Sequence, residues 1–272
     1  MKLIATTDTL AYGLTEAYHM ALMLMHRYGR LRDCPDWKTE CLEASLIMTV
    51  NHPLAEPRIS KLGIHTPESL QQYVREMVCG IMDFEVERGN WEYTYHQRMQ
   101  DQIEAVIQEL KRNPYSRRAV IRVAEPNDIL MNDPPCLQLI QYQLRDNCLD
   151  CTVYFRSNDL WEATFMNAFA LIEIQQLMAS ELNALVGTYR HIAENAHIYK
   201  KDFEAFKSFV NKYSNLAITD PIGYELFVEK SILHNDTAYY FDPLNKDTDD
   251  WSTMMVDANA SIDAKITRLK GE

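Results

Sequence analysis

Two strand-like segments separated by a short polar turn, residues 137–144 and 150–156, constrain the fold of this chain more than any other feature. Both segments are rich in apolar, β-branched and aromatic side chains, and residues 145–148 between them have the composition of a turn. This pattern predicts an antiparallel hairpin, in which the beginning of the first strand lies beside the end of the second. Cys136 is therefore expected to lie near Arg156.

The expected pairing has a chemical meaning. A guanidinium next to a thiol lowers the pKa of the thiol and makes it a usable nucleophile near neutral pH. The alternative is that Cys136 is a small buried hydrophobe, which is the interpretation kept for Cys148 and Cys151.

Composition limits the class of protein. The chain has 272 residues, of which 47% are hydrophobic, and contains no obvious linker, so we expect one globular domain spanning residues 1–272. No apolar run approaches the roughly 18 residues that span a bilayer. The six cysteines lack metal-ligand spacing and no signal peptide is recognisable, which predicts a cytoplasmic protein without a metal.

The net charge also limits the kinds of ligand that the protein can bind. A net charge of −12 argues against general binding to nucleic acid. Any anionic ligand must therefore meet a local group of basic side chains.

The remaining pattern is a mixture of helices and strands. Apolar side chains at helical spacing predict helices near residues 12–28, 67–84, 101–110, 163–186 and 202–212, the fourth being long and central to the core. Strands are expected at 45–50, 119–123 and 224–232, a strand and turn at 187–199, and an irregular charged stretch at 30–43. The fold class is therefore α+β.

Several polar residues in these elements admit a functional interpretation. Glu76 lies in an apolar helix, where it either faces solvent beside Arg75 or lines a cleft. Asn167 lies in the central helix and needs hydrogen-bond partners, which a ligand could supply. His197 and Tyr199 alternate, so their side chains could point to the same side.

Two adjacent arginines, Arg117 and Arg118, follow Pro114 at the entrance of a strand. They are either a solvated surface or a clamp for phosphate, because a guanidinium offers planar, paired donors.

Four ordered motifs support a more specific hypothesis. They are residues 101–121, the run Pro134-Pro135-Cys136, residues 154–159 with Asn167 eleven residues after Arg156, and residues 197–199. With these motifs the chain resembles the thymidylate synthase family, which includes pyrimidine nucleotide hydroxymethylases, while its first sixty and last fifty residues match poorly. The resemblance implies a thymidylate synthase-like single domain, with a large, mostly antiparallel or mixed sheet flanked by helices around a long central helix.

The resemblance also implies a function, which is folate-dependent transfer of a one-carbon unit to C5 of a pyrimidine nucleoside 5′-monophosphate. Cys136 would add to C6 of the ring, and 5,10-methylenetetrahydrofolate would be the co-substrate. The residues implied for nucleotide binding are Arg156 and Ser157 for the phosphate, joined by Arg117 and Arg118 of a second subunit in a homodimer, Asn167 for the base, and His197 and Tyr199 for the sugar.

The remaining implied residues concern the folate and the proton transfers. Asp159 would face the folate, Glu76 would organise water and proton transfers, and Tyr95 would line the cleft.

The chain departs from the family pattern at several positions. Leu137 replaces the histidine that follows the nucleophile, residues 193–195 replace a Gly-Gly-Asp run, and residues 163–165 replace a Gly-Leu-Pro stretch. The N-terminal phosphate-binding arginine is not recognisable, although Arg30 or Arg32 could substitute, and residues 270–272 are not the family's apolar tail.

These departures gather around the folate and the lid, which favours hydroxymethylation over reductive methylation. Asparagine at position 167 goes with uracil in this family, so dUMP is the preferred substrate, with dCMP and CMP left open. Two other classes remain, a cysteine hydrolase using Cys136 and His197, and a catalytically silent nucleotide-binding relative.

Overall fold

The computed structural model describes residues 12–60, 64–216 and 238–239. The helices are α1 (Leu14–Tyr28), α2 (Pro67–Cys79), α3 (Phe84–Glu87), α4 (Tyr95–Arg112), α5 (Thr164–Glu181) and α6 (Phe203–Leu216), with short 3-10 helices η1 (Pro35–Trp37), η2 (Asp128–Leu130) and η3 (Lys200–Asp202). The strands are β1 (Arg30–Cys34), β2 (Thr39–Val50), β3 (Ile59–Ser60), β4 (Val120–Arg122), β5 (Leu137–Arg145), β6 (Cys148–Phe155), β7 (Asn158–Asp159), β8 (Leu185–Tyr199) and β9 (Ala238–Tyr239).

A mixed sheet organises the molecule. Its strand order is β1-β2-β8-β6-β5-β4, with β7 pairing β8 off this path. The pairs β6–β8 and β7–β8 are parallel, and the other pairs in this sheet are antiparallel. A parallel pair requires a crossover connection, which α5 supplies between β6 and β8.

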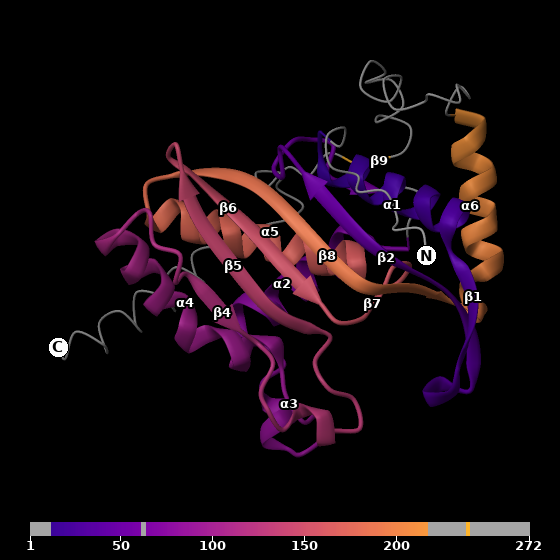
Figure 1. The fold of residues 1–272 in the computed structure, drawn as a ribbon, viewed down its shortest axis with the longest axis horizontal. Coiled ribbons are helices and arrows are strands. Elements are labelled where there is room, and N and C mark those ends of the chain that lie inside the picture. The colour runs from indigo at the N-terminus through magenta and orange to yellow at the C-terminus, as the bar shows by residue number, and fades with distance from the viewer. Residues whose placement is uncertain (1–11, 61–63, 217–237, 240–272) are drawn as a thin grey trace.

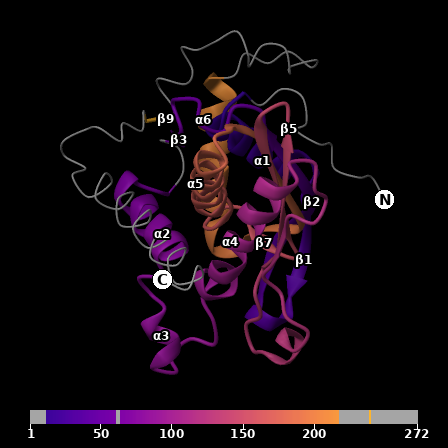
Figure 2. The same ribbon diagram turned by 90° about the vertical axis from the view of Figure 1, so that its left-hand side faces the viewer.

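The helices lie on one side of the sheet (Figures 1 and 2). Viewed edge-on, the strands lie on the right, α5 lies to their left, and α2 lies beyond α5 as a further layer (Figure 2). The structure thus confirms the α+β class and the sheet flanked by helices. A single domain over residues 1–272 stays a prediction.

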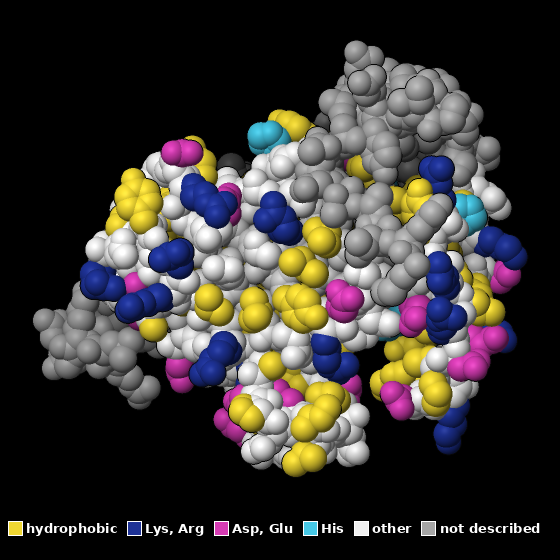
Figure 3. Space-filling model, viewed as in Figure 1, with side chains coloured by type: hydrophobic (Ala, Val, Ile, Leu, Met, Phe, Trp, Pro, Cys, Tyr) yellow, Lys and Arg dark blue, Asp and Glu magenta, His cyan; other side chains and the backbone are white. Residues whose placement is uncertain are grey.

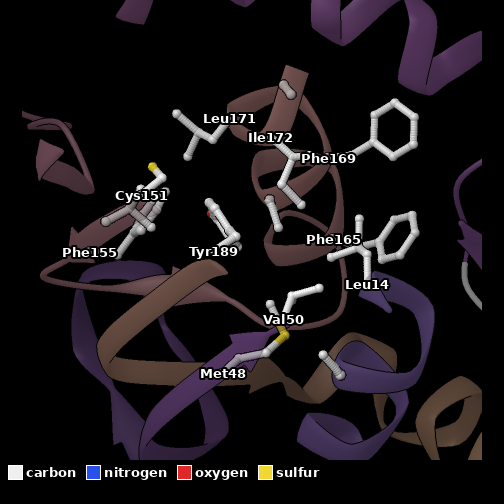
Figure 4. Close-up of a cluster of buried hydrophobic side chains, with 14 of the residues drawn as sticks. Leu14, Met48, Val50, Cys151, Phe155, Phe165, Phe169, Leu171, Ile172 and Tyr189 are labelled. Carbon is white, nitrogen blue, oxygen red and sulfur yellow. The ribbon is translucent and has the colours of Figure 1, made fainter. Parts of the chain in front are cut away.

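The core lies between the sheet and α5. Figure 4 shows Phe165 and Ile172 of α5 on the side of the helix that faces Val50 of β2 and Tyr189 of β8, while Phe169 points away from these strands. All five are buried, with at most 1% of their surface exposed. The predicted central role of this helix is confirmed, because α5 is apolar on nearly every face and buried along most of its length.

Local signals set several helix ends as expected. Thr66 caps α2, with its hydroxyl accepting from the backbone N–H of Ser69 at 3.3 Å, and Pro67 occupies the first turn. The helix ends sooner than predicted, because Gly80 adopts the left-handed conformation with φ of 67°. A Cβ at Gly80 would also lie 2.2 Å from Nδ1 of His96.

Several predictions about the elements were wrong. The helix expected at 163–186 ends at Glu181, and Leu185 already begins β8. The charged stretch 30–43 contains the β1–β2 hairpin rather than irregular chain, and residues 185–199 form one strand without a turn. Helix α4 begins at Tyr95, six residues before its expected start. The strand expected at 224–232 lies outside the described residues.

The opposite face of the sheet carries no helix among the described residues. Apolar side chains lie across it among scattered arginines and lysines (Figure 3). Below it, the same view shows a deep notch between the part of the molecule that contains α3 and the tip of the β1–β2 hairpin (Figures 1 and 3).

Candidate active site

The β5–β6 hairpin brings Cys136 and Arg156 together, as its two strands predicted. Leu137 pairs with Phe155, and the backbone N–H of Arg156 donates to the carbonyl of Cys136 at 2.9 Å. The Arg156 guanidinium donates from Nε to the carbonyl of Pro135 at 3.0 Å and from Nη2 to the carbonyl of Pro134 at 2.6 Å. The double-proline run is thus anchored by the arginine that ends the hairpin.

The electrostatic surroundings of Cys136 differ from the expectation. Burial raises the pKa of the Cys136 thiol, and the nearby Asp133 carboxylate raises it further. Arg156 lowers the same pKa, but its effect is smaller than that of burial. The predicted direction of the arginine's influence is right, while the net lowering of the pKa is wrong for the protein alone.

A cleft of ≈ 420 Å³ opens beside this cysteine. Its lining includes Glu76 of α2, the predicted Tyr95 of α4, and Asp133, which precedes the double proline. The Tyr95 hydroxyl accepts from the backbone N–H of Leu137 at 3.3 Å, and burial raises the pKa of Tyr95 to about 12. Glu76 therefore lines a cleft, and Tyr95 remains a protonated phenol there.

Sequence reasoning missed three aromatic residues of the same cleft, Tyr73, Trp91 and Tyr93. Burial raises the pKa of Tyr73 and of Tyr93, and the charge of a Cys136 thiolate would raise both further. A signal was available, because Tyr73 precedes Glu76 by three residues and therefore shares its face of the helix.

Asn167 and Tyr73 are joined although 94 residues separate them. The Tyr73 hydroxyl donates to Oδ1 of Asn167 at 2.5 Å, and Asn167 is buried. This contact leaves the Nδ2 group of Asn167 as the donor end of the amide. The amide that the sequence singled out in the central helix thus has a partner in α2, with its oxygen towards Tyr73 in this structure.

The parallel pairing of β7 with β8 assembles a second group. Asp159 pairs with His197, and Oγ of Ser157 lies 3.4 Å from Nδ1 of His197. The rings of His197 and Tyr199 lie edge to face with centroids 4.7 Å apart, which confirms that they point to one side. Asp159 also accepts from the backbone N–H groups of Trp161 and Glu162, both at 2.9 Å.

Burial shifts the pKa values of both Asp159 and His197. Burial raises the pKa of Asp159, opposed by its backbone hydrogen bonds and by His197. Burial likewise lowers the pKa of His197, and the Asp159 charge opposes that shift. His197 is therefore neutral near pH 7.

A buried hydrogen-bond network next to Asp159 and His197 was also missed by the sequence reasoning. Oδ1 of Asn158 accepts from Nε2 of His191 at 2.9 Å and from the hydroxyl of Thr164 at 2.8 Å. Nδ1 of His191 in turn accepts from the Tyr189 hydroxyl at 3.0 Å. The network ties β7 to β8 and to the first residue of α5, so it fixes the strand that follows Ser157 and the helix that carries Asn167.

Arg117 and Arg118 lie away from these groups. Val120 pairs with Gln141, so the arginines that precede it lie beyond the middle of β5, about 20 Å along the strand from Cys136 at 3.3 Å per residue. Both arginines are exposed, in a turn after α4. Within one chain they are not part of the site.

Three carboxylates near the site lie close enough together to share a cation. Oxygens of Asp159, Glu162 and Asp202 lie within 4.8 Å of one another. Nζ of Lys201 already lies 2.7 Å from both oxygens of Glu162. The protein thus supplies a cation of its own at this place.

Aromatic and thioether side chains form much of the lining of the cleft, together with carboxylates and an amide. Such a lining suits a flat ring system with polar edges. No helix among the residues that the structure describes is long and apolar enough to cross a membrane.

Comparison with known proteins identifies the family. A family model described as thymidylate synthase matches residues 72–221. Proteins named putative thymidylate synthase from Methanosarcina barkeri and Methanosarcina mazei are 27% and 28% identical to this chain, and each match covers 74% of this chain and 93% of the relative. A thymidylate synthase of Staphylococcus haemolyticus is 34% identical over 115 residues, covering 42% of this chain and 36% of that protein. The chain is a divergent member of the thymidylate synthase family.

Proposed function

We propose that this protein transfers a one-carbon unit from 5,10-methylenetetrahydrofolate to C5 of dUMP, through a covalent bond between Cys136 and C6 of the pyrimidine. The observation that carries the proposal is the meeting of Cys136, the Arg156 guanidinium and a tyrosine-lined cleft at one end of the hairpin. Membership in the thymidylate synthase family supports it.

The covalent step explains the need for a thiol. C5 of a pyrimidine becomes nucleophilic when Sγ adds to C6, because the addition converts the ring into an enolate equivalent. Negative charge then grows on O4, where the Nδ2 donor of Asn167 can stabilise it. Since burial raises the pKa of Cys136, we expect thiolate formation to depend on Arg156.

Contacts with the phosphate and sugar supply the positioning. Arg156 and Ser157 would bind the 5′-phosphate, and His197 and Tyr199 the sugar, so that C6 is held against Sγ. An acidic protein can then bind an anion through a few concentrated arginines.

The orientation of Asn167 supports uracil over cytosine. With Oδ1 accepting from Tyr73, the amide presents a donor, which complements O4 of uracil and opposes the amino group of cytosine. The test is tritium release from C5-labelled dUMP and dCMP, and release from dCMP alone would refute the uracil assignment.

The folate would supply the one-carbon electrophile. We propose that Asp159 and Glu76 contact it, with Glu76 also organising the water that moves protons at the ring. Tyr95, whose pKa is about 12, remains a proton donor during this step.

For the product, we propose 5-hydroxymethyl-dUMP, formed when water adds to the exocyclic methylene at C5 and the Cys136 thiolate leaves C6. The departures at 137, 163–165 and 193–195 support this choice. The names of the relatives favour reductive methylation instead, in which the folate delivers hydride and dihydrofolate forms. Product mass and dihydrofolate formation separate the two, since stoichiometric dihydrofolate with methylated product contradicts hydroxymethylation.

Cys136→Ser tests the covalent mechanism. Turnover should fall below detection while dUMP still binds, because the phosphate and base contacts remain. The matched control is Cys148→Ser at the opposite end of the hairpin, which should retain turnover. Equal activity in Cys136→Ser and the parent protein would overturn the mechanism.

We also propose a homodimer that completes the phosphate site with Arg117 and Arg118 of the partner subunit. Their distance from Cys136 in one chain supports this, and so does the sheet face that no described helix covers. If the site is shared, mixing Cys136→Ser with Arg118→Ala should restore about one quarter of the parent activity, because random pairing yields half heterodimers with one intact site each. Two inactive variants that stay inactive after mixing would contradict sharing.

A further inference from the structure

A β-bulge in the pairing of β2 with β8 lies next to the proposed sugar site. Ala44 pairs with Ala196 and Leu46 with Ala193, so Glu194 and Asn195 together oppose the single residue Ser45. Bulges beside functional sites commonly re-aim a side chain. Here the bulge lies in the run 193–195, where the chain departs from the Gly-Gly-Asp of its family.

Three side chains meet just beyond the bulge. Glu43 of β2 is paired directly with His197 of β8. Nδ2 of Asn195 donates to Oε2 of Glu43 at 2.8 Å, and Oδ1 of Asn195 lies 3.1 Å from Nδ1 of His197. The other oxygen of Glu43 accepts from Nε of Arg32 at 3.3 Å.

These contacts determine which ring nitrogen of His197 carries the proton. A carboxylate only accepts, so Glu43 fixes the Asn195 amide with its NH2 group towards β2 and its oxygen towards the histidine. The backbone carbonyl of Asn195 also lies 3.3 Å from Nδ1 of His197. Both oxygens only accept hydrogen bonds, and both lie closer to Nδ1 than the Ser157 hydroxyl, which is 3.4 Å away and can accept as well as donate. The nearer contacts therefore favour a hydrogen on Nδ1.

The other ring nitrogen is therefore an acceptor. Burial and the positive charge of Arg156 lower the pKa of His197, although the Asp159 and Glu43 carboxylates and the Asn195 carbonyl oppose the shift. The residue is only 7% exposed, and Nε2 has no hydrogen-bond partner among the described residues. A buried lone pair without a donor is costly, and an O–H or N–H of a ligand would remove that cost.

We propose that Glu43 and Asn195 are positioning residues that hold His197 in its Nδ1-protonated tautomer, so that Nε2 accepts a hydrogen bond from a hydroxyl group of the substrate. The identity of that hydroxyl rests on the proposed function. In dUMP, C5′ is phosphorylated and C1′ carries the base, which leaves the 3′-hydroxyl as the one free hydroxyl of the sugar.

The tautomer can be measured without any substrate. At about pH 8, where a histidine with an ordinary or lowered pKa is neutral, the 15N chemical shifts of the His197 ring distinguish a protonated from an unprotonated nitrogen. The parent protein should show Nδ1 protonated. A parent spectrum with Nε2 protonated overturns the proposal.

Glu43→Gln tests the role of the carboxylate. A glutamine amide can donate as well as accept, so the Asn195 amide can turn and offer its NH2 group to Nδ1, and the fraction of Nδ1-protonated His197 should fall to about one half or below. The matched control is Ser45→Ala, which removes a 3.4 Å contact with Glu194 between the same two strands and should leave the tautomer unchanged. An unchanged tautomer in Glu43→Gln overturns the proposal, and a melting curve verifies that both variants fold.

Affinity for two nucleotides links the tautomer to the hydroxyl. If only the Nδ1-protonated form binds the hydroxyl, the Kd of dUMP in Glu43→Gln should rise by the inverse of the measured fraction, at least about twofold. The 2′,3′-dideoxy analogue lacks the 3′-hydroxyl, so its Kd should be the same for the parent protein and for Glu43→Gln. A rise of equal size for both nucleotides refutes the contact, and failure of dUMP to bind at all refutes the proposed function, while the spectra still decide the tautomer.

Discussion

The buried histidine of the β7–β8 network predicts a measurable pH dependence of stability. His191 is fully buried, and burial lowers its pKa from the ordinary 6.5 to about 3. Its neutral ring already satisfies both nitrogens, since Nε2 donates to Asn158 and Nδ1 accepts from Tyr189. A second proton would therefore bring an uncompensated charge into the core.

The lowered pKa of His191 sets the direction and the size of the change in stability with pH. The unfolded chain binds a proton at His191 below pH 6.5 and the folded protein does not, so the contribution is complete above 6.5 and is lost as the pH falls towards 3. At a pH 1.5 units below the pKa of the unfolded state, such a group has lost about 2 kcal/mol of its contribution to stability. The free energy of unfolding should therefore fall by about 2 kcal/mol between about pH 8 and about pH 5. The full loss, reached near pH 3, is about 5 kcal/mol.

The assay compares urea unfolding of the parent protein and of His191→Gln across this range. At about pH 8 the variant should be less stable by about 1–3 kcal/mol, because a buried hydrogen-bond network is altered. That gap should narrow by about 2 kcal/mol at about pH 5, since the variant has no imidazole to protonate at this position. Tyr189→Phe keeps the imidazole and should keep the parent's pH dependence. Parallel curves for the parent and His191→Gln would refute the reasoning.

Four further substitutions test other contacts. Glu173→Leu should lower the free energy of unfolding by about 3–5 kcal/mol in a urea titration, because it removes the carboxylate of a buried ion pair with Arg58; a loss under 1 kcal/mol would contradict that. Arg156→Lys should weaken dUMP binding by about tenfold or more by calorimetry, since a single ammonium cannot replace the guanidinium's paired donors, and unchanged affinity would remove Arg156 from the phosphate site. Tyr73→Phe should raise tritium release from dCMP relative to dUMP by about fivefold, because the amide of Asn167 is freed to turn. Asn167→Asp should move the same ratio further towards dCMP, and a fixed ratio in both variants would exclude the amide from base selection.

Local spacing in the sequence was sufficient for the hairpin and several helix ends. The alternation of residues 137–156 and the polar turn between them place Cys136 beside Arg156, because a hairpin pairs residues that are close along the chain. Thr66 with Pro67 predicted the beginning of α2 for a similar reason, since capping involves only the first turn. The family motifs lie in the same local segments, which is why the resemblance emerged from them.

Local spacing did not predict the charged strand β1 or the full length of β8. The β1–β2 hairpin was missed because most of the residues of β1 are exposed, so burial does not impose an alternating pattern there. β8 was divided in the prediction because a bulge at residues 194–195 interrupts its alternation, and only the pairing with β2 reveals it.

The sequence by itself determined the candidate nucleophile, its arginine and the membership of the family, because each depends on residues close together along the chain. The tertiary structure alone decided how the parts meet. It joined Tyr73 to Asn167 across 94 residues, placed Asn195 between Glu43 and His197, and separated Arg117 and Arg118 from the cysteine of their own chain. The physical reason is that donor and acceptor geometry is set by which strands and helices pack together, and that packing depends on the burial of whole faces rather than on any single motif.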